Sequence, residues 1–174
     1  MKTYLAFAAS LLLTFMVARP VSAQGVFKVE KGEALNKIVP RNFVLEENAI
    51  PVEKRNSALV ITPSGARMVA GLLDTSGYTS QVQEKYLGML ITEGNVEVGG
   101  HRIAIGSYGF GLVKAAGDAQ GKSARFILYN QAGHRIAECT AKWDSKLRTP
   151  RPLQVVASGG TARLYIGRNW VELK

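Results

Sequence analysis

The sequence has a single cysteine, Cys139, among 174 residues, so no disulfide can form within one chain. It has only two histidines, His101 and His134, and neither lies in a motif with metal-ligand spacing. The pattern G-x-S-x-G of an activated serine is absent as well. These absences predict a fold that is stabilised by packing alone. They favour a non-enzymatic protein without a metal or a cofactor.

Acidic residues are scarce, with 13 Asp and Glu against 22 Lys and Arg, and the net charge is +9. A basic surface of this kind suits anionic surroundings, so anionic envelope polymers are candidate partners. Nucleic acid is not expected, because the sequence has neither a recognition helix nor basic residues interleaved with aromatic ones. We interpret the basic segment Lys146–Pro152 as a solvated loop between two strands.

The sequence has no apolar run of the ~20 residues that a membrane-spanning helix needs. Its apolar run Leu5–Ala18 follows the positive charge of Lys2 and precedes the small residues Val21-Ser22-Ala23, an order typical of secretory signal peptides. We therefore expect residues 1–23 to be a signal peptide and residues 24–174 to form a single β domain. The mature chain is expected to be periplasmic or extracellular and to have no transmembrane segment.

Glycine is abundant, and the segment from Gly94 to Val113 carries the clearest local prediction. Its dipeptide Gly99-Gly100 lies between two alternating runs and suits a two-residue hairpin turn with positive φ angles. Counting outward places Val96 opposite Ile103 on one face. The same register places Glu97 opposite Arg102 as an ion pair on the other face.

A second hairpin is predicted around a two-residue loop at Ala132-Gly133. This register places Cys139 opposite Phe126 on the apolar face of the hairpin. We therefore expect Cys139 to be a buried, unreactive thiol rather than a nucleophile paired with a histidine.

The C-terminal segment predicts two further turns. Gly159-Gly160 places Val155 opposite Leu164. A turn at Arg168-Asn169 would then place Leu164 opposite Leu173, which keeps all these aliphatic side chains on one face.

Repeated hairpins without a long amphipathic helix predict an all-β fold. The expected arrangement is an antiparallel β-sandwich built from hairpins, and the alternative is a closed β-barrel. Helix is expected only in short turns at residues 33–39 and 80–83, the latter within a polar loop of unassigned role at residues 74–85.

Four aromatic residues are the candidates for a ligand or partner surface: Tyr108, Phe110, Tyr165 and Trp170. Their expected positions on strand faces would let them stack on sugar rings or anchor a partner. Tyr108 and Phe110 alternate with glycines that leave the opposite strand face bare, a feature that admits close approach of another group.

The sequence favours an exported, non-enzymatic protein with a binding or envelope-structural role. Its partner would be an anionic envelope polymer or another envelope protein. The alternatives are a hydrolase of envelope polymers, for which no catalytic residues can be assigned, and a small-ligand carrier with a cavity inside a barrel.

Overall fold

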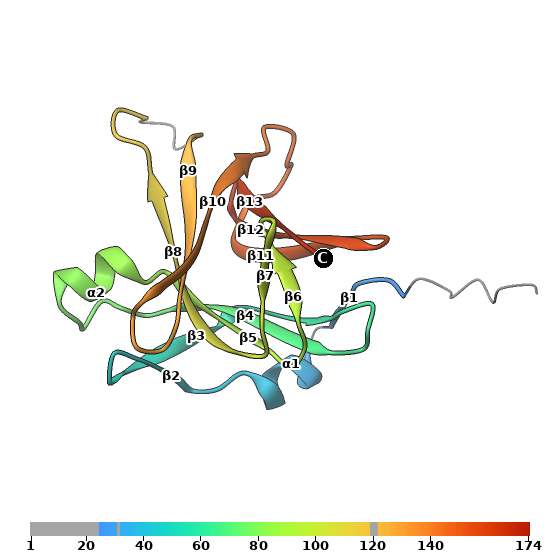
Figure 1. The fold of residues 1–174 in the computed structure, drawn as a ribbon, viewed down its shortest axis with the longest axis horizontal. Coiled ribbons are helices and arrows are strands. Elements are labelled where there is room, and N and C mark those ends of the chain that lie inside the picture. The colour runs from blue at the N-terminus through green and yellow to red at the C-terminus, as the bar shows by residue number, and fades with distance from the viewer. Residues whose placement is uncertain (1–24, 31, 119–121) are drawn as a thin grey trace, which may run out of the picture.

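The computed structural model describes residues 25–30, 32–118 and 122–174. The predicted signal peptide, residues 1–23, lies outside them. The described chain is all-β and antiparallel, as expected, with two short helices (Figure 1). Within the described ranges, no helix has the length and apolarity needed to cross a membrane.

The elements follow one another as short strands joined by turns. They are β1 (Lys28–Glu30), α1 (Glu33–Ile38), β2 (Asn42–Leu45), β3 (Asn48–Ile61), β4 (Arg67–Leu73), α2 (Ser80–Lys85), β5 (Gly88–Thr92), β6 (Val96–Val98), β7 (His101–Ile103), β8 (Gly106–Lys114), β9 (Ala124–Tyr129), β10 (Arg135–Trp143), β11 (Arg151–Ser158), β12 (Thr161–Gly167) and β13 (Asn169–Leu173).

These strands form one large sheet in the order β1-β3-β4-β5-β8-β9-β10-β13-β12-β11. The hairpin β6–β7 joins it at β13, and β2 pairs with the first half of β3. The sheet curls until its two ends meet, where the backbone N–H of Phe27 donates to the carbonyl oxygen of Gly159 at 3.2 Å. The result is a nearly closed barrel, the second of the two predicted arrangements.

Side chains fill the inside of this curled sheet. Phe110 and Phe126 stack there with ring centroids 5.2 Å apart, surrounded by fully buried aliphatic residues such as Leu90, Leu128 and Leu164. Burial of large apolar side chains is the main favourable contribution to folding, since each stabilises by about 1.5–3 kcal/mol. The described interior is therefore a packed core.

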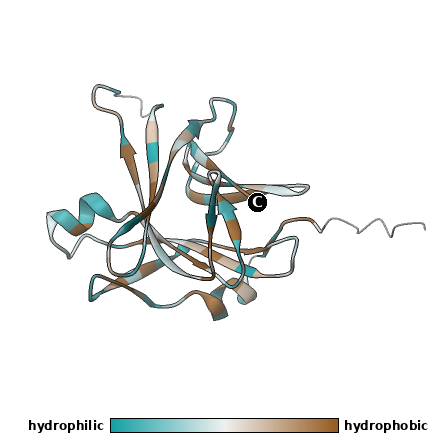
Figure 2. Cartoon of the chain, viewed as in Figure 1, coloured by the Kyte–Doolittle hydropathy of each residue, from teal (hydrophilic) through white to brown (hydrophobic). Residues whose placement is uncertain are grey.

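A second core lies on the outer face of the strands β3, β4, β5, β8 and β9. It contains Leu45, Ile50, Tyr86 and Met89, all at most 1% exposed, and β2 and the segment containing α2 contribute to it. The outward residues of α2 are hydrophilic (Figure 2). Because the central strands are buried on both faces, β4 carries six consecutive buried residues instead of an alternating pattern.

The predicted register of the Gly99-Gly100 hairpin is confirmed, with φ angles of 58° and 89° at the two glycines and Val96 opposite Ile103. The expected ion pair within it does not form. Although Glu97 is the cross-strand neighbour of Arg102, its ion-pair partner is Lys174, at 3.9 Å. Strand β13 lies beside β6 and brings the end of the chain within reach.

The second hairpin has the predicted pair Phe126–Cys139 but a different turn. Asn130 N–H donates to the carbonyl of His134 at 3.0 Å, so the loop has one residue more than predicted. A bulge between Arg135 and Ala137 then takes up the extra residue and restores the register.

In the last hairpins the pair Val155–Leu164 is confirmed, but the predicted pair Leu164–Leu173 is wrong. The turn lies one residue earlier than predicted because Gly167 adopts a φ of 61°, and Leu164 therefore pairs with Val171. The strands slip by two residues, and a slip of two leaves the same side chains inside.

A charged cluster joins the β2–β3 turn to the C-terminal end of α2. Both turn residues, Glu46 and Glu47, have positive φ angles. The carboxylate of Glu46 accepts hydrogen bonds from the Lys85 ammonium and, at 2.5 Å, from the Tyr86 hydroxyl. These bonds lower the pKa of Glu46, and burial together with the bond to Glu46 raises the pKa of Tyr86.

We predict that Glu46→Gln lowers the free energy of unfolding at pH 7 by about 1.5–3 kcal/mol, the usual range for hydrogen bonds to a charged group. Because the pKa of Glu46 is lowered in the folded state, this stabilisation is present above the ordinary carboxyl pKa. It is lost as the pH falls through the lowered value. Denaturant titrations from pH 7 to pH 3 should show the two proteins converging, whereas the exposed neighbour variant Glu47→Gln should match the wild type throughout.

Candidate functional site

Two of the four aromatic candidates belong to the interior. Phe110 is 0% exposed and stacks on Phe126 inside the curled sheet, so its expected place on a partner surface is wrong. Tyr108 points to the same side, is partly buried, and donates its hydroxyl to the carbonyl of Ala104 at 2.9 Å. The aromatic face of this strand is the one that the closing sheet covers.

The bare glycine face of β8 is filled as well. A Cβ atom at Gly109 would lie 2.9 Å from Leu45 Cδ1 and equally close to the ring of Tyr86. One at Gly111 would overlap the carbonyl oxygen of Lys85. These glycines therefore admit the second core and do not line a ligand site.

We predict that Gly109→Ala lowers the free energy of unfolding by about 1–3 kcal/mol, the usual cost of overpacking. Gly160→Ala is the matched control, because a Cβ there meets open space and the φ of Gly160 is not positive. It should stay within about 0.5 kcal/mol of the wild type in chemical denaturation. A Gly109→Ala protein as stable as the control would show that the face is not tightly packed.

Tyr165 and Trp170 lie directly opposite each other on β12 and β13, with ring centroids 6.3 Å apart. Tyr165 is nevertheless 3% exposed, and its hydroxyl donates to Asp144 Oδ2 at 2.9 Å. The loop after β10 covers it, held by Arg168, whose guanidinium donates to the carbonyls of Asp144 and Leu147. Tyr165 is thus unavailable to a partner in this arrangement.

Trp170 is the aromatic candidate that retains a polar, partly open setting. The Arg163 guanidinium carbon lies 4.2 Å from its ring centroid and the Lys142 ammonium 4.9 Å from it. Trp170 and Arg163 border an open hollow of about 380 Å³ together with Trp143, Asp144, Ser145 and Lys146, and Lys142 lies outside its lining. We call this group the Trp170 surface.

The histidines and the cysteine do not form a reactive centre. A ring nitrogen of His101 is 2.8 Å from the carbonyl oxygen of Glu138, and His134 is exposed in its turn. Cys139 is partly buried against the core, where burial and the nearby Glu138 raise the pKa of its thiol. In the part of the chain that the structure describes, no three His, Cys, Asp or Glu side chains are grouped to hold a metal ion.

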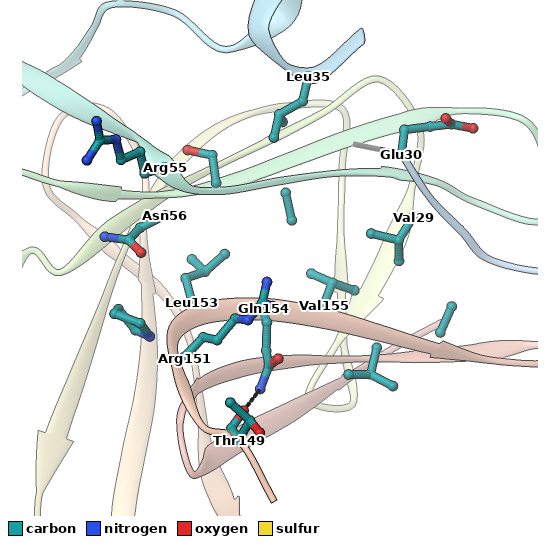
Figure 3. Close-up of a pocket in the computed structure, with 15 residues that line it drawn as sticks. Val29, Glu30, Leu35, Arg55, Asn56, Thr149, Arg151, Leu153, Gln154 and Val155 are labelled. Carbon is teal, nitrogen blue, oxygen red and sulfur yellow. Dashed lines mark hydrogen bonds between the residues drawn. The ribbon is translucent and has the colours of Figure 1, made fainter. Parts of the chain in front are cut away.

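The structure contains a larger candidate site that sequence reasoning missed, a cleft of about 640 Å³ where the two ends of the sheet meet. We call it the seam cleft (Figure 3). Its walls are β3 and β11, β1 lies at one end, and a residue of α1 also contributes. The lining residues are Val29, Glu30, Leu35, Arg55, Asn56, Ser57, Ala58, Thr149, Arg151, Pro152, Leu153, Gln154, Val155, Val156 and Ala157.

The cleft exists because β1 is too short to close the sheet. β1 pairs with β3 only from Lys28, opposite Ile61, to Glu30, opposite Leu59. Gly32 then has a φ of 73° and α1 begins at the next residue, so the chain leaves the line of the strand. Beyond Glu30, the edges of β3 and β11 face each other without a β-strand ladder between them in the described residues.

The far end of the cleft is shaped by a bulge in β3. Glu53 pairs with Leu72, and the next pair is Ser57 with Gly71, so residues 54–56 have no partners on β4. Two residues at this bulge, Arg55 and Asn56, line the cleft. A bulge of this kind bends a strand and redirects its side chains.

The charges of the cleft are separated along its length. Arg55 and Arg151 lie toward the bulge end, whereas Glu30 lies at the β1 end (Figure 3). Neither guanidinium group forms a hydrogen bond or an ion pair with another residue in the described ranges. Val29 supplies apolar surface at the β1 end, and Leu153 and Val155, which belong to the packed core, line the cleft between the two ends.

Comparison with protein-family models, with curated proteins and with solved structures found no significant match. The structure itself defines the fold class, an all-β antiparallel sheet nearly closed into a barrel. It also contains a candidate binding cleft at the seam of that sheet.

Proposed function

We propose that this chain is an exported, non-enzymatic binding protein that holds an extended peptide segment of a partner protein in the seam cleft. The observation that supports this proposal is an open strand edge that continues the line of β1. The signal-like N-terminus supports export, because its charged start, apolar run and small-residue site occur in the order used for secretion.

The pattern of lining residues favours a peptide. All seven residues from Arg151 to Ala157 border the cleft, and so do the four from Arg55 to Ala58. Side chains on a strand face would contribute every second residue, so consecutive residues indicate that strand edges form these walls. Strand edges present backbone N–H and C=O groups, which bind extended peptides by strand addition.

The width of the cleft assigns the peptide to one edge. Parts of β3 and β11 bring their Cα atoms within 8 Å of each other. A strand paired on both sides would separate its neighbours by roughly 9.6 Å, or two strand spacings. The parts that lie this close leave no room for a strand between them, so we place the peptide on the edge of β11 only where β3 lies farther away.

The other two functions considered find less support. A carrier would bind its ligand inside the barrel, where buried side chains such as Phe110 and Phe126 are packed. A glycan hydrolase would need two converging carboxylates, and Glu30 is the one acidic residue among those that line the seam cleft.

A bulky side chain at the bulge tests the site. We predict that Asn56→Trp, which projects a large ring into the cleft, weakens binding of hits from a random-peptide display library at least about tenfold. Lys54→Trp is the matched control, since it lies in the same bulge but does not line the cleft. Dissociation constants for the hits, with thermal unfolding as a check on folding, decide the result. Equal binding by the two variants, or a library without hits, would contradict the proposal.

The Trp170 surface supports a second candidate function, the binding of an anionic polymer. The cationic groups of Arg163 and Lys142 both lie against the Trp170 ring, and Lys146, which has no ion-pair partner in the described residues, lines the adjoining hollow beside one carboxylate, Asp144. Cations arranged next to aromatic rings suit acidic sugars, because the charges bind carboxylates and the rings contact sugar faces.

We predict that the protein binds polygalacturonate and not neutral dextran, and that Arg163→Gln weakens this binding several-fold more than Arg102→Gln, an exposed charge-matched control on β7. Binding by sedimentation or calorimetry should weaken as salt is raised. Equal losses in the two variants would indicate attraction to the net charge alone.

A further inference from the structure

We propose that the seam cleft recognises the C-terminal end of a peptide, with the free carboxylate at the end of the cleft that carries Arg55 and Arg151. This inference rests on the proposed function and adds to it a direction and a terminal group. It follows from three independent features of the seam: the direction of its walls, the placement of its charges and its length.

The walls of the cleft run in the same direction. From β3 to β11 the sheet order passes through eight steps, each of them antiparallel, so β11 is parallel to β3 across the seam. β1 lies between them antiparallel to β3, and Phe27 bonds to Gly159 on the other side. A peptide that continues the line of β1 in the same direction is therefore antiparallel to both walls, the more stable pairing.

This direction determines which end of the peptide meets which charges. Successive residues of β1 lie opposite decreasing numbers of β3, from Ile61 to Leu59. The same line leads on past Ala58 to Arg55. The N-terminal side of a bound peptide thus lies near Glu30 and its C-terminal side near the arginines.

The charges match that polarity. A terminal carboxylate at the bulge end would lie at the end of the cleft that carries Arg55 and Arg151, whose guanidinium groups have no partner in the described residues. Guanidinium–carboxylate pairs form bidentate, charge-assisted hydrogen bonds. The reverse direction would place a peptide amine beside two arginines and a carboxylate beside Glu30. Like charges at both ends disfavour it.

The length of the cleft limits the number of residues bound. Four residues of β3, from Arg55 to Ala58, border it. At a strand rise of about 3.3 Å per residue, this wall spans roughly 13 Å, room for about four peptide residues. The apolar side chains of Leu153 and Val155 between the charged ends favour aliphatic residues in the middle of this segment. Glu30 favours a basic side chain or an amine at its start.

The test compares two forms of one random-peptide library, synthesised either with a free C-terminal carboxylate or with a C-terminal amide. We expect hits from the free-acid library to bind at least about tenfold more tightly than their amide counterparts. The double variant Arg55→Gln/Arg151→Gln should remove this difference. Arg41→Gln/Arg102→Gln, which removes two exposed charges outside the cleft, should retain it.

The direction has its own readout. A photoreactive group on the amino end of a free-acid hit should crosslink to β1 near Glu30, and crosslinking near Arg55 instead would overturn the proposed direction. If the free-acid and amide peptides bind equally, and Asn56→Trp weakens the binding of both, the recognition of a C-terminus is overturned. The proposal that the cleft binds an extended peptide would then still stand. An absence of binding by either library would overturn the proposed function together with this inference.

Discussion

Burial of both faces of the central strands is the constraint on which the rest of this structure depends. One face of β3, β4, β5, β8 and β9 turns toward the interior of the curled sheet, and the other lies under the segments that contain β2 and α2. A chain without a disulfide gains most of its stability from such burial. The second layer can approach only where the sheet has no side chains in the way, and Gly109 and Gly111 provide that space.

Curling of the sheet around the first core also produces the seam. A sheet of alternating antiparallel strands closes without conflict when β1 lies between β3 and β11, and it does so for three residues. The helix that follows Gly32 contributes only partly buried residues, Leu35 and Ile38, to the second core. The turn after β1 therefore leaves part of the barrel unpaired. The open strand edges and the two arginines line the cleft because β1 ends there.

The sequence predicts local pairing better than it predicts the closure of the sheet. Registers set by glycine turns, such as Val96–Ile103 and Val155–Leu164, can be counted directly, because a two-residue loop fixes which residues face each other. The same counting fails where another glycine competes for the turn, as Gly167 does. It also cannot tell which face of an isolated hairpin a distant strand will cover, and this is why Phe110 was expected on a partner surface.

The seam cleft was beyond such reasoning for a related physical reason. Its residues come from segments about a hundred positions apart, and no local pattern indicates that β11 returns beside β3. The charged run at residues 53–55 is visible in the sequence, but an alternating strand pattern gives no sign that residues 54–56 form a bulge. Arg55 and Arg151 form part of one site only because the two ends of the sheet lie side by side in the folded protein.

The seam also affects how copies of this chain behave toward one another. The free edge of a β-sheet is a template for pairing with other chains and hence a route to aggregation. Here the edge of β11 faces the opposite end of its own sheet and is bordered by two unneutralised arginines. A second copy that brought its own β11 to this edge would meet a wall and like charge, so the recess protects the protein in concentrated solution.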